Sequence, residues 1–104
     1  MIHVVARIQA RPGKGRALRE AFSLLLPQVL AEVGCIRYVP TVDAASGIER
    51  QAHADVDAVT IVELWETLEH LKAHLKASHM IAFRTNVGAL IESTDLRILE
   101  EATG

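Results

Sequence analysis

The side chains best suited to chemistry in this chain are histidines, because three of the five, His70, His74 and His79, lie within ten residues of one another. Imidazole changes its charge near neutral pH, so a partly buried histidine can take a proton from a substrate. We therefore treat His74 and His79 as candidate bases. The alternative for each is a structural histidine that is hydrogen-bonded to a neighbouring backbone carbonyl.

The first two of these histidines also raise the question of a metal site. His70 and His74 are i and i+4 on a predicted helix, a spacing that can hold a metal ion. No glutamate follows His70 directly, and the sequence shows no obvious third ligand. Helix geometry points His70 towards water and places His74 on the flank of the apolar stripe, roughly 90° from its centre. We predict an exposed His70 and no metal site.

A second group of candidates lies on the strongest predicted strand, residues 58–65. Alternation along that strand puts Glu63 and Trp65 on one face, where they could line an apolar pocket with a polar floor. Core packing for Trp65 and an ion pair for Glu63 remain the alternative. Tyr38 could donate a hydrogen bond to a ligand oxygen or lie in an interface. Cys35 has no adjacent base, so we expect it to be a small buried hydrophobe.

The first half of the chain predicts a strand followed by a helix. Residues 2–10 alternate in the period of a strand, and the segment 11–15 reads as a turn because it lacks the Walker spacing of a phosphate loop. Residues 16–33 then follow the period of a helix that ends at Gly34. Pro27 lies opposite the apolar stripe and should kink or split this helix. The stripe consists of Leu18, Ala21, Phe22, Leu25, Val29 and Val33.

The second half predicts two strands, a helical segment and a last short strand. Residues 35–43 form a strand that Pro40 marks as an edge or bulged strand, and residues 44–56 form a long loop. After the strand 58–65, Thr67 caps a helix to about residue 77, and Ser78 caps another. Residues 96–99 close the chain as a strand. The two helices direct inward Leu68, Leu71 and Leu75, and Met80, Phe83, Val87, Leu90 and Ile91.

This order of elements predicts an α+β fold, the βαββαβ ferredoxin-like sandwich, in a single domain over residues 1–104. Helices would cover one face of an antiparallel sheet. The strands 2–8 and 58–65 carry apolar residues on both faces, and half of this short chain is hydrophobic. We therefore expect a homodimer in which a second sheet covers the other face.

Composition excludes several classes of protein. No stretch approaches the ~20 apolar residues that span a bilayer, and no basic segment precedes the apolar N-terminus as in a signal peptide. A net charge of −2 with scattered Lys and Arg gives no basic stripe for nucleic acid. The single cysteine fits a reducing compartment. We expect a cytoplasmic protein with no membrane span and no nucleic-acid partner.

Three segments together resemble the antibiotic biosynthesis monooxygenase domain: residues 34–38 (GCIRY), 63–66 (ELWE), and 71–75 (LKAHL) followed by 78–80 (SHM). The resemblance covers nearly the whole chain, and it is greatest to the small bacterial quinol monooxygenases. It implies a homodimer whose two sheets face each other in an α+β barrel, with a pocket in each subunit between sheet and helices. It also implies oxidation of hydroquinones or phenols by O₂ without metal or flavin.

On this resemblance we expect a cofactor-independent monooxygenase that acts on a quinol or a related phenolic compound. His74 or His79 would be the base, and Tyr38 or Arg84 would hold a phenolate or a developing superoxide. The implied partners are a small aromatic or quinone-type substrate and a second copy of the chain, and no cofactor is implied. The expected substrate-binding residues are Tyr38, Glu63, Trp65, Met80, Phe83 and Arg84.

Two other functions stay open from the sequence. One branch of the family isomerises a phosphorylated signalling sugar, and its histidines resemble His74 and His79. Such a reaction needs a phosphate-binding group, for which the candidates are Arg37, Arg50 and Arg84. The other possibility is a non-catalytic, dimeric ligand-binding domain.

Overall fold

The computed structural model describes residues 1–103 and contains the predicted succession of elements in the predicted order. A 3₁₀ turn, η1, joins the last helix to the last strand. The elements are β1 (Ile2–Ala10), α1 (Gly15–Leu30), β2 (Cys35–Val42), β3 (Ala58–Trp65), α2 (Leu68–Lys76), α3 (Ser78–Val87), η1 (Gly88–Leu90) and β4 (Ile91–Glu100). The α+β ferredoxin-like prediction is confirmed.

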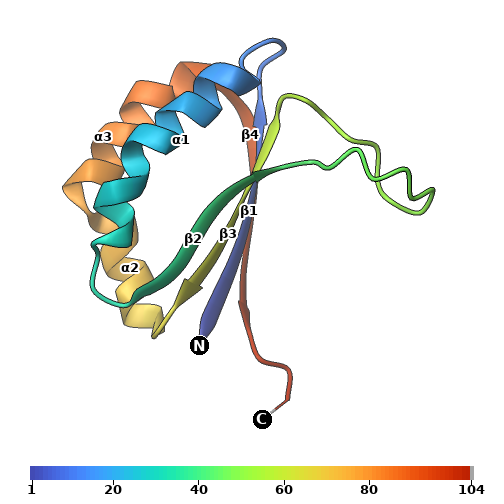
Figure 1. Cartoon of the computed structure of the whole chain (residues 1–104). Coiled ribbons are helices and arrows are strands. Elements are labelled where there is room, and N and C mark those ends of the chain that lie inside the picture. The colour runs from blue at the N-terminus through green and yellow to red at the C-terminus, as the bar shows by residue number, and fades with distance from the viewer. Residues whose placement is uncertain (104) are drawn as a thin grey trace.

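The four strands form one antiparallel sheet in the order β2-β3-β1-β4. Figure 1 shows the three α-helices against one face of this sheet, whereas the connection between β2 and β3 extends away on the other side. Pro40 lies in the edge strand β2, as predicted, and the pairing of β2 with β3 shifts register between Cys35 and Arg37. The segment 44–56 is irregular, also as predicted.

The core lies between the helices and the covered face of the sheet. Alternation in β1 buries Val4, Ala6, Ile8 and Ala10, and β3 contributes Val59, Ile61 and Trp65 from the neighbouring strand. Helix α1 covers them with four residues of the predicted stripe, namely Leu18, Phe22, Leu25 and Val29. Burying each large side chain contributes about 1.5–3 kcal/mol, so this interface fixes the helices over the sheet.

Helix α1 ends at Leu30, three residues before the predicted end at Val33. Val33 was expected to face the core, but its exposed fraction is 80%. The chain turns back towards β2 within this segment, and Gly34 supplies the positive φ of 82° that the turn needs. Of the two outcomes predicted at Pro27, the split is wrong, because α1 continues through this residue as one helix, and the kink stays a prediction. A proline on the solvent side removes only a single backbone donor.

The last strand is longer than predicted, since β4 spans Ile91–Glu100 rather than residues 96–99. Ile91 was expected on a helix and instead opens this strand. β4 is an exposed edge strand that is held by its pairing with β1 from Ala10 to Ile2. Its residues 92–95 are polar, so the sequence shows no hydrophobic alternation there that would predict a strand. Register with the partner strand, not hydrophobic alternation, defines this element.

Helix α2 is rotated relative to the prediction. Leu71 is buried as expected, but Leu68 and Leu75 keep exposed fractions of 40% and 38%. His74, expected on the flank of the stripe, is 2% exposed. The helix therefore directs a histidine, instead of two leucines, into the interior.

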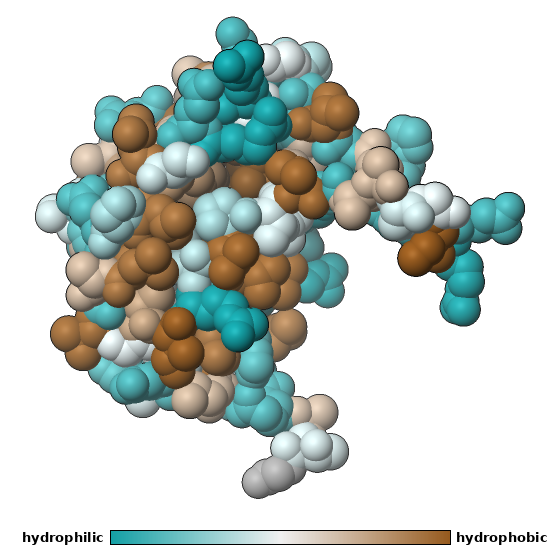
Figure 2. Space-filling model, in the orientation of Figure 1, coloured by the Kyte–Doolittle hydropathy of each residue, from teal (hydrophilic) through white to brown (hydrophobic). Residues whose placement is uncertain are grey.

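The face of the sheet opposite the helices carries apolar side chains that nothing in this chain covers. Val39, Val62 and Val5 are paired across β2, β3 and β1, and Val39 and Val62 are 42% and 38% exposed. Figure 2 shows hydrophobic residues over much of the surface that it presents. Among residues 1–103, no helix is both long and apolar enough to cross a membrane.

Candidate active site

The two candidate bases converge on a glutamate. Nδ1 of His74 and Nε2 of His79 each lie 2.8 Å from the same atom, Oε2 of Glu32. Glu32 lies in the turn between α1 and β2, His74 on α2, and His79 in the first turn of α3. One carboxylate oxygen thus joins the turn after α1 to the consecutive helices α2 and α3, more than forty residues later in the sequence. The sequence interpretation missed Glu32, because it treated the residues before Gly34 only as the end of a helix.

The His74 ring lies between two aromatic rings of the sheet. Its centroid is 4.6 Å from that of Trp65 on β3 and 5.6 Å from that of Tyr38 on β2. Burial lowers the pKa of His74 below its ordinary value, although the hydrogen bond to Glu32 and its charge act in the opposite direction. Near neutral pH His74 is therefore an uncharged imidazole, the form that can accept a proton.

A cavity of about 210 Å³ lies between the sheet and the helices, at the position that the sequence predicted for a pocket. It contains six of the eight predicted site residues: Tyr38, Glu63, His74, Met80, Phe83 and Arg84. Its other walls are mostly aliphatic or aromatic, including Ile8, Phe22, Ile61 and Val87, with Thr94 and Leu96 from the edge strand β4. The cavity therefore combines an apolar body with a small number of polar groups, as ligand sites do.

Three polar atoms of the residues that line this cavity have no partner in the protein. Oε1 of Glu63 accepts a hydrogen bond of 2.9 Å from the Trp65 indole, and Nδ1 of His74 donates to Glu32. Within the described part of the chain, every fully enclosed side-chain nitrogen or oxygen has a hydrogen-bond partner. Glu63 Oε2, His74 Nε2 and the Tyr38 hydroxyl have no such partner and are therefore not fully enclosed, and all three belong to residues that line the cavity.

Burial also changes the acidity of the two other polar groups. It raises the pKa of Glu63 to about 7, an effect that the Trp65 hydrogen bond opposes and the charge of Glu32 reinforces. It raises the pKa of Tyr38 far above its ordinary value of 10, with Glu63 and Glu32 adding to the effect. Tyr38 thus remains a hydroxyl donor, and Glu63 changes its protonation state near neutral pH.

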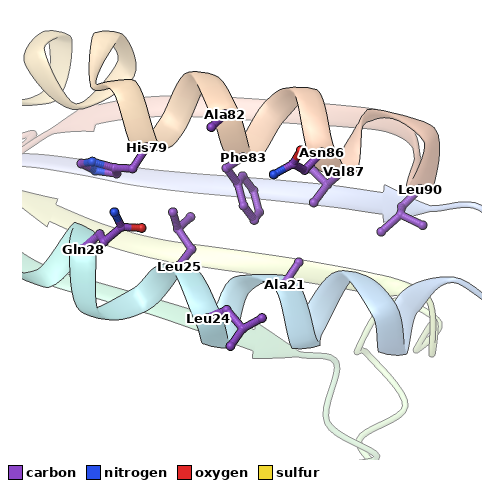
Figure 3. A pocket seen from close by; sticks show the side chains of 10 residues that line it. All are labelled: Ala21, Leu24, Leu25, Gln28, His79, Ala82, Phe83, Asn86, Val87 and Leu90. Atoms are coloured by element: carbon purple, nitrogen blue, oxygen red, sulfur yellow. The ribbon is translucent and has the colours of Figure 1, made fainter.

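Two predicted site residues lie elsewhere. Trp65 is 0% exposed and does not line the cavity, so the prediction of a direct wall is replaced by contacts to Glu63 and His74. His79 lies at one end of a separate groove of about 460 Å³ between α1 and α3, which Figure 3 shows together with Gln28 at the same end. Phe83 lines both the groove and the cavity, and its ring forms part of the wall between them.

Arg84 lines the cavity, and one of its guanidinium nitrogens already donates a hydrogen bond within the protein. Its Nη2 atom donates to the carbonyl of Leu75 at 2.7 Å, which ties α3 to the last turn of α2. The remaining guanidinium N–H groups are available to a ligand oxygen.

The first histidine of the cluster has a structural role. His70 contacts the Thr67 hydroxyl through Nδ1 at 2.9 Å, and a Cβ added at Gly34 would come within 2.2 Å of its ring. It is half-buried rather than fully solvated. Over residues 1–103, no cluster of three or more His, Cys, Asp or Glu side chains has the arrangement of a metal site.

The geometry describes a mostly apolar chamber whose polar lining consists of the uncharged His74 imidazole, the Tyr38 hydroxyl, the Glu63 carboxyl and the Arg84 guanidinium. An aromatic alcohol fits these groups, since its ring matches the apolar walls and its hydroxyl can donate to the imidazole.

Comparison with known proteins agrees with this fold. Over 102 residues the chain is 38% identical to "Probable quinol monooxygenase YgiN" of Escherichia coli K12, covering 96% of this chain and 97% of the relative. The same identity and coverage hold for the protein of that name in Shigella flexneri.

Solved structures with the same fold extend over nearly the whole chain. PA3566 from Pseudomonas aeruginosa superimposes with a TM-score of 0.82 at 24% identity, covering 98% of this chain and 94% of its own. SO0527 from Shewanella oneidensis gives a TM-score of 0.79 at 26% identity, covering 94% and 87%. Residues 1–86 match the family model for antibiotic biosynthesis monooxygenases, and together with the 38% identity this match shows that the chain belongs to the antibiotic biosynthesis monooxygenase family.

Proposed function

We propose that this chain is a cofactor-independent monooxygenase that oxidises a quinol or a related phenol with O₂ in the cavity between sheet and helices. For a hydroquinone the balanced reaction is hydroquinone plus O₂ to hydroxyquinone plus water. One oxygen atom forms a bond to a ring carbon, the other leaves as water, and the substrate supplies all four electrons. The observation that carries the proposal is the apolar cavity onto which an uncharged imidazole, His74, opens.

The size of the cavity supports a compact ring system. An apolar cavity of about 150 Å³ accommodates benzene. At about 210 Å³ this cavity has room for a somewhat larger substituted or fused aromatic ring, provided that its substituents are small. The buried Glu63 at the polar end disfavours an anionic substrate and favours a neutral hydroxyl group.

In this proposal the protein supplies binding and proton transfer, and the substrate supplies the electrons. Nε2 of His74 takes the hydroxyl proton, which makes the ring electron-rich enough to reduce O₂. The Tyr38 hydroxyl and the Arg84 guanidinium hold the phenolate or the reduced oxygen by hydrogen bonds to a charged acceptor. Met80 and Phe83 exclude water from the reacting ring. The relative named as a quinol monooxygenase supports this choice of substrate class.

We also propose that the working unit is a cytoplasmic homodimer. The three valines paired across β2, β3 and β1, Val39, Val62 and Val5, form an apolar row on the open face of the sheet. A second copy packed against this face would cover it and form a two-sheet barrel. Isomerisation of a phosphorylated metabolite has less support, because Arg84 is the sole arginine that lines the cavity among the residues described.

Oxygen uptake by purified, metal-free protein tests this function. With menadiol as substrate, the wild-type chain should consume O₂ faster than the spontaneous reaction, and the His74→Asn variant should lose most of the difference. The matched control is His53→Asn, which changes an exposed histidine in the loop 44–56 and should leave the rate unchanged. An uptake rate equal to that without protein, for menadiol and for a panel of simple hydroquinones and naphthols, would refute the proposal.

A further inference from the structure

We infer that Glu32 is a positioning residue that makes His74 the base of the cavity, and that His79 weakens this base by competing for the same carboxylate oxygen. The catalytic part of this inference rests on the proposed function. The electrostatic part, a coupled pair of histidines on one carboxylate, stands on the geometry alone.

The first step concerns which nitrogen of His74 carries the proton. A carboxylate only accepts hydrogen bonds, so the 2.8 Å contact to Glu32 requires an N–H at Nδ1 of His74. The neutral ring then carries its lone pair on Nε2, which has no hydrogen-bond partner in the protein and belongs to a residue that lines the cavity. Glu32 thereby selects the tautomer in which His74 can act as a base, and its charge stabilises the imidazolium that forms.

The second step is that His79 uses the same acceptor atom as His74. Nε2 of His79 donates to Oε2 of Glu32, also at 2.8 Å, so both imidazoles donate to the same oxygen atom. The side chains become more exposed along the series, from 2% for His74 to 13% for Glu32 and 19% for His79. A proton on His79, at the outer groove, therefore neutralises the charge that would otherwise stabilise a proton on His74 in the cavity. Two histidines that share one carboxylate are electrostatically coupled.

Three other titratable groups face His74. Tyr38 on β2 and Glu63 on β3 face it from the sheet, and Arg84 faces it from α3. The positive charges of His79 and Arg84 both disfavour a proton on His74, whereas Glu32 favours it. The competing hydrogen bond distinguishes His79 from Arg84, which instead donates to the Leu75 carbonyl.

A purely structural Glu32 would predict a different outcome on substitution. Glutamine has the same shape and can still accept one N–H, so Glu32→Gln keeps a link between the segments but removes the charge. If Glu32 only joins the turn to the helices, the proton affinity of His74 should hardly change in this variant. If Glu32 positions and charges the base, removing the carboxylate should weaken it.

The decisive measurement is an NMR titration of the histidine side chains in the wild-type chain and in two variants. Glu32→Gln should lower the pKa of His74 by about one unit or more, since an opposite charge at this distance shifts a pKa by ~1–3 units. His79→Asn should raise it, because Glu32 then serves a single histidine. The matched control Glu20→Gln removes an exposed carboxylate from α1 and should leave His74 unchanged.

Oxygen uptake as a function of pH gives the catalytic readout. In Glu32→Gln kcat should fall at least about tenfold with KM nearly constant, and the acid limb of the profile should move to lower pH. In His79→Asn the acid limb should move to higher pH, and Glu32→Asp should recover part of the lost rate because it retains the charge.

The outcomes separate the two proposals. If the wild-type chain shows no catalysed uptake, the proposed function fails while the NMR titration still decides the coupling. A His74 pKa that is unchanged in both variants, or that moves in the same direction in both, overturns the inference. If Glu32→Gln does not fold, as judged by circular dichroism, the rise expected in His79→Asn decides alone.

Discussion

The buried carboxyl of Glu63 should make the stability of this protein fall as the pH rises towards neutrality, a range in which exposed carboxylates are already ionised. Its side chain is 6% exposed, and burial raises its pKa from an ordinary value of 4.5 to about 7. Glu63→Gln keeps the size of the side chain and its ability to accept from the Trp65 indole, but it cannot ionise. The variant therefore isolates the cost of the charge.

The sign and size of the effect follow from proton linkage. Below pH 4.5 the carboxyl is protonated in both states, so the stabilising effect of its higher folded-state pKa is fully present. Between pH 4.5 and about 7 the folded chain keeps a proton that the unfolded chain has lost, and this contribution disappears as the pH rises through 7. The difference between 4.5 and about 7 corresponds to about 3 kcal/mol in the free energy of unfolding.

The assay is urea denaturation of the wild-type chain, Glu63→Gln and the control Glu66→Gln from pH 4.5 to 8, at one protein concentration. The free energy of unfolding of Glu63→Gln relative to wild type should rise by about 3 kcal/mol across this range, since all other titrating groups are common to both chains. Glu66 is exposed, so its variant should follow the wild type. A difference between Glu63→Gln and wild type that does not increase with pH would refute a raised pKa at Glu63.

Three further predictions concern the turn, the open sheet face and a loop ion pair. Gly34→Ala should cost more stability in urea than Gly13→Ala. Both glycines have a positive φ, which strains an alanine by ~1–2 kcal/mol, but only at Gly34 would the added Cβ meet the His70 ring. Equal costs for the two variants would contradict this. Light scattering should give twice 11.4 kDa for the wild type and a monomer for Val62→Lys, whereas a wild-type monomer at micromolar concentration excludes the two-sheet barrel. Arg7 holds the pKa of Asp43 at about 2, so the stability that this ion pair contributes is present above pH 4 and lost as the pH falls to 2. Asp43→Asn should remove this loss of stability in acid and lower the free energy of unfolding at neutral pH by about 1 kcal/mol. An acid-unfolding curve that is the same in the variant and the wild type would argue against the ion pair.

The sequence predicted the elements whose pattern comes from burial and missed those that depend on pairing or turns. The strand β1 and the stripe of α1 were correct because alternating and helical periods record which side faces the core. The strand β4 was underestimated because it pairs with β1 at an exposed edge, where residues 92–95 are polar. Val33 was placed on the stripe because periodicity alone does not show where a helix must stop for the chain to turn.

The site was predicted in part for a similar reason. Six of the eight proposed site residues reach the cavity, since alternation on β2 and β3 and the stripe of α3 follow regular periods. Glu32 was missed because its partners His74 and His79 lie more than forty residues away, and no local pattern marks a carboxylate in a turn as the acceptor of two imidazoles. The sequence nonetheless held one signal, because a buried, neutral histidine needs an acceptor for its N–H and a carboxylate outside the predicted site can supply it.

The positions of the two buried titrating groups explain why an apolar cavity can carry proton chemistry. Near neutral pH, burial favours the protonated form of Glu63 and the unprotonated form of His74, and both forms are uncharged. Apart from the Arg84 guanidinium, the lining then presents little charge to a neutral aromatic alcohol or to O₂, neither of which carries a charge. In the proposed reaction, charge arises when the hydroxyl proton moves to Nε2 of His74, and the imidazolium then lies 2.8 Å from the carboxylate of Glu32. The charge of Glu32 is therefore held outside the cavity lining, where it stabilises the product of proton transfer without repelling the phenolate across open space.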